Sequence, residues 1–400
     1  MKPGWQTKQL GELAELKGRI GWRGLTAKEY TESGPLFLSV HSLNYGDYVD
    51  FRDAFHISEE RYEESPEIIL QKNDVLICKD GAGIGKLGII RDLPDKATIN
   101  SSLLLIRSGK EVLPKFLYHC LSSPYFQSIV ISRLNGATTP HLYQRDITEF
   151  PVVLPPLPEQ QRIVGILDEA FAGIATAKAN TEKNLNNARA IFESHLNAVF
   201  TQRGEGWVEK TLDEIGKTQT GSTPKTADQT NYGDFSPFVK PADFNVDGTI
   251  DYRNDGLSKK GFTSARAVPA GSVLMVCIGA TIGKCGYCDQ DVATNQQINA
   301  LTPNDGSSHR FLYYQMLTKT FQQSVIHNSG QATLPIINKS KWSALPVWLP
   351  PNVAQQKKIA AKFDLLMEQT QHLESTYKQK LAALETLKKS LLHQAFSGEL

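Results

Sequence analysis

Two segments of this chain carry apolar residues at steps of three and four positions. Neither 158–200 nor 353–396 contains proline after its opening residue, and glycine is scarce in both. The apolar positions are Ile163, Leu167, Ala170, Ile174, Ala177, Leu185, Ala188, Phe192, Leu196 and Val199 in the first segment, and Ile359, Phe363, Leu366, Leu373, Tyr377, Leu381, Leu384, Leu391 and Ala395 in the second. This spacing over about five heptads predicts two long helices, each with a single apolar seam. About 37 residues at ~1.5 Å each give a rod of roughly 55 Å. A lone rod cannot bury its seam, so we expect the two helices to pair.

The remaining sequence has a different pattern. Short β-branched runs alternate with turn signals such as Ser33-Gly-Pro35, Asn44-Tyr-Gly46 and Asp247-Gly-Thr249. This pattern predicts compact domains of short strands with some helix. One helix is expected over residues 114–131, with a counterpart near residues 309–325.

The two halves of the chain repeat each other. Residues 81–88 (GAGIGKLG) match 279–286 (GATIGKCG) at six of eight positions, and each copy follows a short apolar run. Further matches join Trp5 with Trp207, 137–140 (ATTP) with 332–335 (ATLP), 151–156 (PVVLPP) with 346–351 (PVWLPP), and Gln160-Gln161 with Gln355-Gln356. One unit of roughly 200 residues is therefore used twice, which excludes a solenoid of short repeats.

The order domain, helix, domain, helix constrains the architecture. The helices can pair antiparallel only if the domains lie at opposite ends of the pair, which implies pseudo-two-fold symmetry. We predict an α+β fold in which two similar mixed α/β domains are joined by an antiparallel coiled coil. The predicted parts are a domain at 1–156, a helical region at 157–202, a domain at 203–351 and a helical region at 352–400. The LPPL and LPPN motifs are interpreted as hinges where each domain ends and each helix starts.

Composition narrows the functional classes. Lys and Arg number 43 and Asp and Glu 42, so the net charge is +1, which excludes a uniformly basic protein but not a local basic patch. Five cysteines, an odd number, favour a reducing cytosol over a disulfide scaffold. The sequence has no signal-peptide core and no run of about 18 apolar residues. We therefore expect a cytoplasmic protein without membrane contacts.

Motifs for catalysis are absent from the sequence. The glycine runs at 81–86 and 279–284 lack GxGxxG spacing, and Leu87 and Cys285 replace the Ser or Thr of a GxxxxGK[ST] loop. We interpret both runs as tight turns between strands in which glycine supplies positive φ, from which Lys86 and Lys284 could reach a DNA backbone. Cys285 and Cys288 have no second ligand pair nearby, so strand cysteines are favoured over a zinc site. No NPPY or DPPY tetrapeptide of a methyltransferase is present.

Nucleic-acid binding is favoured on indirect grounds. Cationic and amide side chains, which hold phosphates and read base edges, interleave with aromatic residues and turns, as at Arg19, Trp22 and Arg23. Any single one of these residues could equally belong to a solvated loop. The candidate DNA contacts are Lys79, Lys86, His141, Gln144 and Arg145 in the first half, and Lys240, Lys284, Asn338, Lys339 and Lys341 in the second. The duplication is the stronger argument, because two similar domains suit a DNA site with two half-sites.

Three motifs resemble a known family. The sequences LPPLPEQQRIVGILD (154–168), LPPNVAQQKKIAAKFD (349–364) and LLHQAFSGEL (391–400), together with the Trp-opened domains, resemble the DNA-specificity subunit of type I restriction–modification systems. The resemblance covers essentially the whole chain. It departs from the family pattern at Ala354, which stands where the first copy has Glu159.

This resemblance implies a function and a set of partners. It implies two target-recognition domains on an antiparallel coiled coil, and a subunit that is not itself catalytic and binds no cofactor. It further implies that the subunit binds double-stranded DNA at a bipartite, asymmetric site, where adenine is methylated. Two methylation subunits would carry S-adenosylmethionine, and restriction subunits would use ATP and Mg²⁺. The alternatives are a stand-alone methyltransferase or nuclease, which would need a cofactor or metal motif, and a coiled-coil adaptor that binds only protein.

Overall fold

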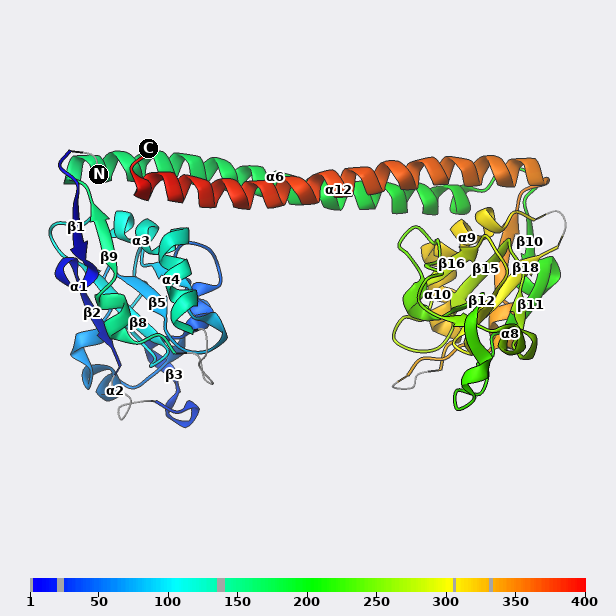
Figure 1. Ribbon diagram of the computed structural model, residues 1–400, viewed down its shortest axis with the longest axis horizontal. Coiled ribbons are helices and arrows are strands. Elements are labelled where there is room, and N and C mark those ends of the chain that lie inside the picture. The colour runs from blue at the N-terminus through cyan, green and yellow to red at the C-terminus, as the bar shows by residue number, and fades with distance from the viewer. Residues whose placement is uncertain (1–2, 20–24, 135–140, 305–306, 331–333) are drawn as a thin grey trace. The chain divides into compact units, whose positions relative to one another are not determined.

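The computed structural model of the chain describes residues 3–19, 25–134, 141–304, 307–330 and 334–400 (Figure 1). The chain folds into two compact units, Met1–Thr181 with Lys380–Leu400, and Glu182–Gln379. Each unit combines one globular part with segments of both long helices. The predicted four-part division at residues 156, 202 and 351 stays a prediction.

The globular part of the first unit contains two small sheets and a separate strand pair. One sheet is antiparallel with the order β2-β8-β5-β6, and the other has the order β4-β3-β7 with β3 and β7 parallel. The antiparallel pair β1-β9 joins the start of the chain to the strand that precedes the first long helix. The strands are β1 Gln6–Gln9, β2 Ala14–Gly18, β3 Thr31–Leu38, β4 Phe55–His56, β5 Val75–Cys78, β6 Leu87–Ile89, β7 Ala97–Ile99, β8 Leu103–Ser108 and β9 Pro151–Leu154. The short helices are α1 Leu10–Leu13, α2 Glu59–Glu63 and α5 Gln144–Thr148, and the 3₁₀ helices are η2 Ala27–Glu29, η3 Val40–Leu43, η4 Pro66–Ile68 and η5 Gly81–Gly83.

The second unit repeats this arrangement. Its sheets have the orders β11-β18-β15-β16 and β13-β12-β17-β14, and β10 pairs with β19 as β1 does with β9. The strands are β10 Val208–Thr211, β11 Gly216–Thr220, β12 Tyr232–Val239, β13 Gly256–Leu257, β14 Ala267–Val268, β15 Ser272–Val276, β16 Cys285–Cys288, β17 Val292–Thr294, β18 Ile298–Pro303 and β19 Pro346–Leu349. The short helices are α7 Leu212–Ile215, α8 Lys259–Ser264 and α11 Lys339–Ser343, with 3₁₀ helices η6 Gln229–Asn231 and η7 Pro241–Asp243. The predicted internal repeat of two mixed α/β domains is confirmed.

A central strand that is buried on both faces explains the continuous apolar runs. In β5, Val75 and Ile77 face one core cluster, whereas Leu76 and Cys78 face another, because successive strand side chains point to opposite faces. Strand β15 divides two cores of the second unit in the same way. Each sheet therefore lies between two apolar layers.

The single helix predicted over residues 114–131 is wrong in one respect. The structure has two helices, α3 Pro114–Ser122 and α4 Pro124–Leu134, separated at Ser123 with ψ 149°. Pro124 disfavours helical backbone at the residue before it. The second unit breaks at the same place without proline, between α9 His309–Leu317 and α10 Lys319–Asn328, where the Thr318 side chain accepts a hydrogen bond from the Phe321 N–H.

The long helices are α6 Leu157–Gln202 and α12 Val353–Ser397, longer than their apolar seams suggest. Within the first unit they run antiparallel, because Arg162 contacts Leu400 while Lys178 pairs with Glu385. Within the second unit Arg189 pairs with Glu374 and Phe200 stacks on Phe363, which is again antiparallel. The predicted pairing is therefore confirmed inside each unit. Among the described residues, no helix combines the length and apolar content needed to cross a membrane.

The helix seams pack against more than each other. Ile163 and Leu167 of α6 and Leu392 of α12 belong to the same core cluster as Phe116 of α3. Leu373, assigned to the seam, is 42% exposed. A helix that packs on one other helix buries less of its surface than a helix that also packs against a globular part. The apolar seam is therefore most buried where it contacts the α3 and α9 regions.

Candidate nucleic-acid interface

The glycine runs form the tight turns predicted from the sequence. In the first unit the run joins antiparallel strands β5 and β6, and Gly81 and Gly85 have φ of 81° and 84°. Gly279 and Gly283 of the second unit have φ of 105° and 89°. Such backbone strains any residue with a Cβ, which accounts for glycine at these positions.

A glutamine from the neighbouring helix fastens each turn. The Gln127 side chain of α4 donates to the Gly85 carbonyl at 3.1 Å, and Gln322 of α10 donates to the Gly283 carbonyl at 2.9 Å. The turn is thereby held in one conformation in both units. Lys86 and Lys284 each follow the last glycine of the turn.

A second segment lies beside the turn of the first unit. The backbone of His141 bridges to Asp80, the Leu142 N–H donates to the Lys79 carbonyl at 2.9 Å, and the His141 ring contacts the Asp80 carboxylate. The structure therefore brings predicted residues 79 and 141, which are 62 positions apart, to one place. In the second unit Ile278 and Ile336 form the equivalent bridge.

The predicted contacts of the first unit differ in availability. The side chain of Arg145 is 78% exposed, with its guanidinium 5.3 Å from the centre of the Tyr143 ring. Lys86 is exposed and donates to Asn44 Oδ1 at 2.7 Å. Lys79 is only 18% exposed, and the Gln144 amide donates to the Leu16 carbonyl at 3.0 Å. Gln144 thus already has a structural hydrogen bond.

The predicted contacts of the second unit lie on two segments. Lys240 pairs with Asp255 at 2.8 Å, and Lys284 lies 3.4 Å from the Pro241 carbonyl, so both border η7. Asn338 caps α11 by accepting a hydrogen bond from the Lys341 N–H at 2.9 Å. Lys341 Nζ donates to the Asn328 carbonyl at 3.3 Å, and Lys339 is exposed. The Asn338 amide oxygen is therefore used by the helix cap.

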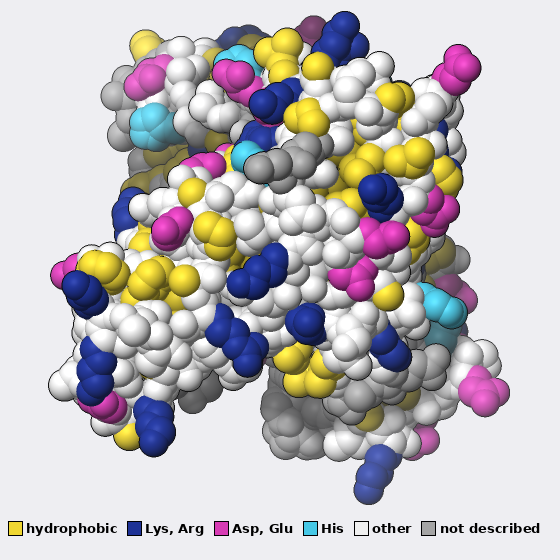
Figure 2. Space-filling view, turned by 90° about the vertical axis from the view of Figure 1, so that its right-hand side faces the viewer, with side chains coloured by type: hydrophobic (Ala, Val, Ile, Leu, Met, Phe, Trp, Pro, Cys, Tyr) yellow, Lys and Arg dark blue, Asp and Glu magenta, His cyan; other side chains and the backbone are white. Residues whose placement is uncertain are grey.

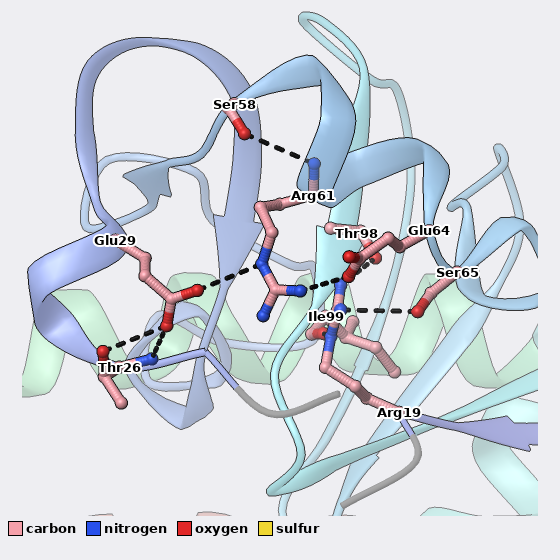
Figure 3. Close-up of polar contacts among 9 residues, drawn as sticks. All are labelled: Arg19, Thr26, Glu29, Ser58, Arg61, Glu64, Ser65, Thr98 and Ile99. Atoms are coloured by element: carbon pink, nitrogen blue, oxygen red, sulfur yellow. Dashed lines mark hydrogen bonds and ion pairs between the residues drawn. The ribbon is translucent and has the colours of Figure 1, made fainter. Parts of the chain in front are cut away.

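Arg19 is a structural residue, contrary to its grouping with DNA-binding cations. It is 3% exposed and donates to the Ile99 carbonyl at 3.0 Å and to the hydroxyls of Ser65 and Thr98 at 3.4 Å (Figure 3). Beside it, Arg61 pairs with Glu29 and Glu64. Trp22 and Arg23, named with it, lie outside the described residues, as do 137–140 and 332–333 of the repeat.

Positive charge is spread rather than concentrated on the face that Figure 2 shows. Lys and Arg side chains are scattered over that face, and several lie across its middle with no Asp or Glu side chain between them. This distribution agrees with the net charge of +1. The cations on this face form no continuous basic surface.

Sequence reasoning missed a pair of anchors between each globular part and its long helix. The fully buried Gln160 accepts from the Leu113 N–H at 2.8 Å and donates to the carbonyls of Glu111 and Pro155 at 2.9 Å. Two turns further along α6, Asp168 accepts from Lys115 Nζ at 2.6 Å and lies 3.4 Å from His119 Nε2. Burial opposes ionisation of Asp168, but the hydrogen bonds from His119 and Lys115 outweigh it and lower its pKa.

The second unit has equivalent anchors. Gln356 accepts from the Ser308 N–H at 2.7 Å, and Asp364 pairs with Arg310 and accepts from the Tyr314 hydroxyl at 2.6 Å. The sequence match of Gln160 to Gln355 is therefore off by one, because the second copy has one more residue between its last strand and the buried glutamine. Both glutamines are buried, and each is followed by isoleucine three positions later and by aspartate eight positions later, so the sequence spacing agrees with the structural pair.

The remaining chemical motifs have structural roles. Cys285 and Cys288 are both buried in β16 and face different core clusters, so their side chains point to opposite faces of one strand. Among the described residues, no group of three or more His, Cys, Asp or Glu could hold a metal ion. The LPP motifs lie between strand and helix in both units, as predicted.

Comparison with known proteins shows that this chain is similar to the members of one family. A family profile described as "Type I restriction modification DNA specificity domain" matches residues 2–187 and 204–383. The chain is 33% identical over 168 residues to the specificity subunit of the type I restriction enzyme HindI of Haemophilus influenzae, which covers 40% of this chain and 36% of that protein. It is 29% identical to the MjaIX specificity subunit of Methanocaldococcus jannaschii, over 40% of this chain and 39% of that protein.

The alignments with these two relatives thus span less than half of their length. A solved structure from work on the assembly and conformational transition of the type I R-M system aligns over 100% of this chain and 99% of that one, with a TM-score of 0.80 and 20% identity, which shows a shared fold. Because the family profile covers most of both repeats, the chain belongs to the family of type I restriction–modification DNA specificity domains.

Proposed function

We propose that this chain is the DNA-specificity subunit of a type I restriction–modification complex and that each of its units reads one half of a bipartite, asymmetric DNA site. The observation that carries the proposal is the repeat itself. Two copies of one family domain, each with its own fastened glycine turn and a lysine directly after that turn, suit a site with two half-sites. The protein-only adaptor is not favoured, because the relatives are named as specificity subunits of restriction enzymes.

The chemistry of modification belongs to other subunits in this proposal. The chain has no glycine-rich cofactor loop and no methyltransferase tetrapeptide. We propose two methylation subunits with S-adenosylmethionine and restriction subunits with ATP and Mg²⁺, acting in the cytoplasm. The chain supplies binding and placement, and no catalytic step.

The ten candidate DNA contacts remain proposals, ranked by how free their side chains are. Arg145 and Lys339 are exposed and are the strongest candidates, and Lys86 is exposed but donates to Asn44. Gln144 and Asn338 are weaker, since each already makes a structural hydrogen bond. Removing a phosphate contact should weaken binding to all DNA sequences alike, whereas removing a base contact should cost ~1–3 kcal/mol and relax one position.

The test is methylation-aware sequencing of a host that expresses the chain with its methylation subunit. We expect one bipartite motif, and exchange of residues 1–155 for the same part of a relative should change one half-site only. The donor should carry a basic residue at the position of Lys115, so that the anchor to Asp168 survives. A motif that is not bipartite, or a change of both halves together, would overturn the proposal.

A binding experiment separates the proposal from the adaptor alternative. Filter binding of duplex DNA in the presence of the methylation subunit should show sequence-dependent retention. The chain alone should transfer no label from S-adenosylmethionine to genomic DNA. Binding of the methylation subunit to the chain, together with no retention of duplex DNA, would favour the adaptor.

A further inference from the structure

Both units carry the same short motif at the same place in the fold. Asp50-Phe51-Arg52 lies between η3 and β4, and Asp251-Tyr252-Arg253 lies between η7 and β13. The Asp50 N–H donates to the Ser42 carbonyl at 2.9 Å, and the Asp251 N–H donates to the Asp243 carbonyl at 2.7 Å. The backbone bonds show that the two motifs are structural equivalents.

Each aspartate holds its arginine in a fixed orientation. Arg52 Nε lies 3.0 Å from both carboxylate oxygens of Asp50, and its Nη2 lies 2.8 Å from one of them. Arg253 places Nε and Nη2 each 2.8 Å from an oxygen of Asp251. The backbone N–H of each arginine donates to the same carboxylate, at 2.9 and 3.1 Å.

This geometry leaves one edge of each guanidinium free. The carboxylate takes the Nε–Nη2 edge, so Nη1 and the outer Nη2 hydrogen still form a fork that fits two oxygen acceptors. The side chains of Arg52 and Arg253 are 63% and 87% exposed, whereas both aspartates are 24% exposed. Hydrogen bonds from Arg253 lower the pKa of Asp251 to about 2.

Stability does not account for the motif. Exposed ion pairs contribute little to folding because water screens them. Holding an arginine in place, by contrast, reduces the entropy that it loses when it binds a ligand. In the first unit the Arg52 guanidinium also lies 4.3 Å from the centre of the exposed Tyr45 ring, which restricts it further.

The arginines lie on the segments that the glycine-turn lysines contact. Lys86 donates to Asn44, the residue before Tyr45, and Lys284 lies 3.4 Å from the Pro241 carbonyl of η7. Asn254, next to Arg253, donates to the Asp243 carboxylate of the same 3₁₀ helix at 2.8 Å. One segment in each unit therefore joins a candidate DNA-contacting lysine to a held arginine.

We infer that Arg52 and Arg253 are a matched pair of DNA-backbone contacts, in which each free guanidinium edge binds a phosphate of its own half-site. The inference rests on the proposed function and adds two residues to it. The backbone is favoured over a base because an asymmetric site presents different bases to the two units but the same phosphates. A motif retained in both units suits the shared feature.

The test uses the full chain assembled with its methylation subunits. Affinity is measured by fluorescence anisotropy over a range of NaCl concentrations, on a duplex with the site found by sequencing and on an equally long duplex without it. Arg52→Ala and Arg253→Ala should each weaken binding to both duplexes about tenfold and reduce the salt slope by about 0.9. In the double variant the affinity should fall about a hundredfold and the slope by about 1.8. The methylated motif should stay the same.

The matched control is Lys72→Ala, because Lys72 is 64% exposed and paired with Asp92 at 2.8 Å in the first unit. It should leave affinity and slope unchanged. Arg52→Lys and Arg253→Lys keep the charge but lose the fork, and they should bind a few-fold more weakly at nearly the wild-type slope, which guards against misfolding of the alanine variants. Unchanged slopes in folded alanine variants, or loss confined to the cognate duplex with one relaxed base, would overturn the inference. Absence of DNA binding by the wild-type complex would instead refute the proposed function.

Discussion

Replacing Gln160 by alanine tests how the long helix is attached to the first globular part. The Gln160 side chain is fully buried and makes three hydrogen bonds of 2.8 to 2.9 Å, to the Leu113 N–H and to the carbonyls of Glu111 and Pro155. Each such bond contributes about 1 kcal/mol net, and a buried group left without a partner costs ~1–3 kcal/mol. We therefore expect Gln160→Ala to destabilise the α3–α6 contact by about 3 kcal/mol, roughly a hundredfold in the opening equilibrium.

Hydrogen exchange measured by mass spectrometry is the suitable assay, because a chain of two units does not unfold in one two-state step. Amides of α3 and of the first turns of α6 should exchange about a hundredfold faster, while those of α9 and of the first turns of α12 serve as an internal reference. Gln161→Ala is the matched control, since Gln161 is the exposed neighbour on the same helix. Equal effects of the two substitutions would refute the reasoning.

Three further predictions follow from the described contacts. Because the pKa of Asp168 is lowered in the folded state, its contribution to the free energy of unfolding is present above about pH 4 and is lost as the pH falls through the lowered pKa. Asp168→Asn should remove this acid-sensitive part of the stability of the first unit, measured by urea titration at several pH values. Identical pH profiles of the variant and the wild type would contradict the prediction. Gly85→Ala should destabilise more than Gly81→Ala, since both have positive φ but only the Cβ at 85 would lie 3.0 Å from Gln127 Oε1; thermal melts of both variants decide this, and equal shifts would count against the role of Gln127. An insertion of four residues beside Thr181, within the continuous helix α6, adds ~6 Å of helix and should lengthen the preferred gap between half-sites by one or two base pairs; methylation of a library with every gap length would disprove this if the wild-type chain accepts many gaps or the preference does not move.

The sequence by itself determined features that depend on neighbouring residues. The three- and four-residue spacing showed the long helices, the glycine runs showed turns with positive φ, and the prolines before Leu157 and Val353 marked where strand gives way to helix. The internal repeat is likewise visible in the amino-acid sequence. These are local effects of backbone geometry and apolar periodicity, which act within a few residues.

Tertiary structure alone decided which side chains meet. Two of the three Gln160 partners, the Leu113 N–H and the Glu111 carbonyl, lie 47 and 49 residues away along the chain, so no pattern within a few residues predicts them. The sequence grouped Arg19 with cations that interleave with aromatic residues, but the folded chain buries it, and the helix break at Thr318 carries no proline to announce it. The aspartate–arginine pairs at 50–52 and 251–253 can be recognised in the sequence, but their exposure depends on how distant segments pack around them. Partner choice and exposure depend on how distant segments pack, and that packing is settled only when the whole unit has folded.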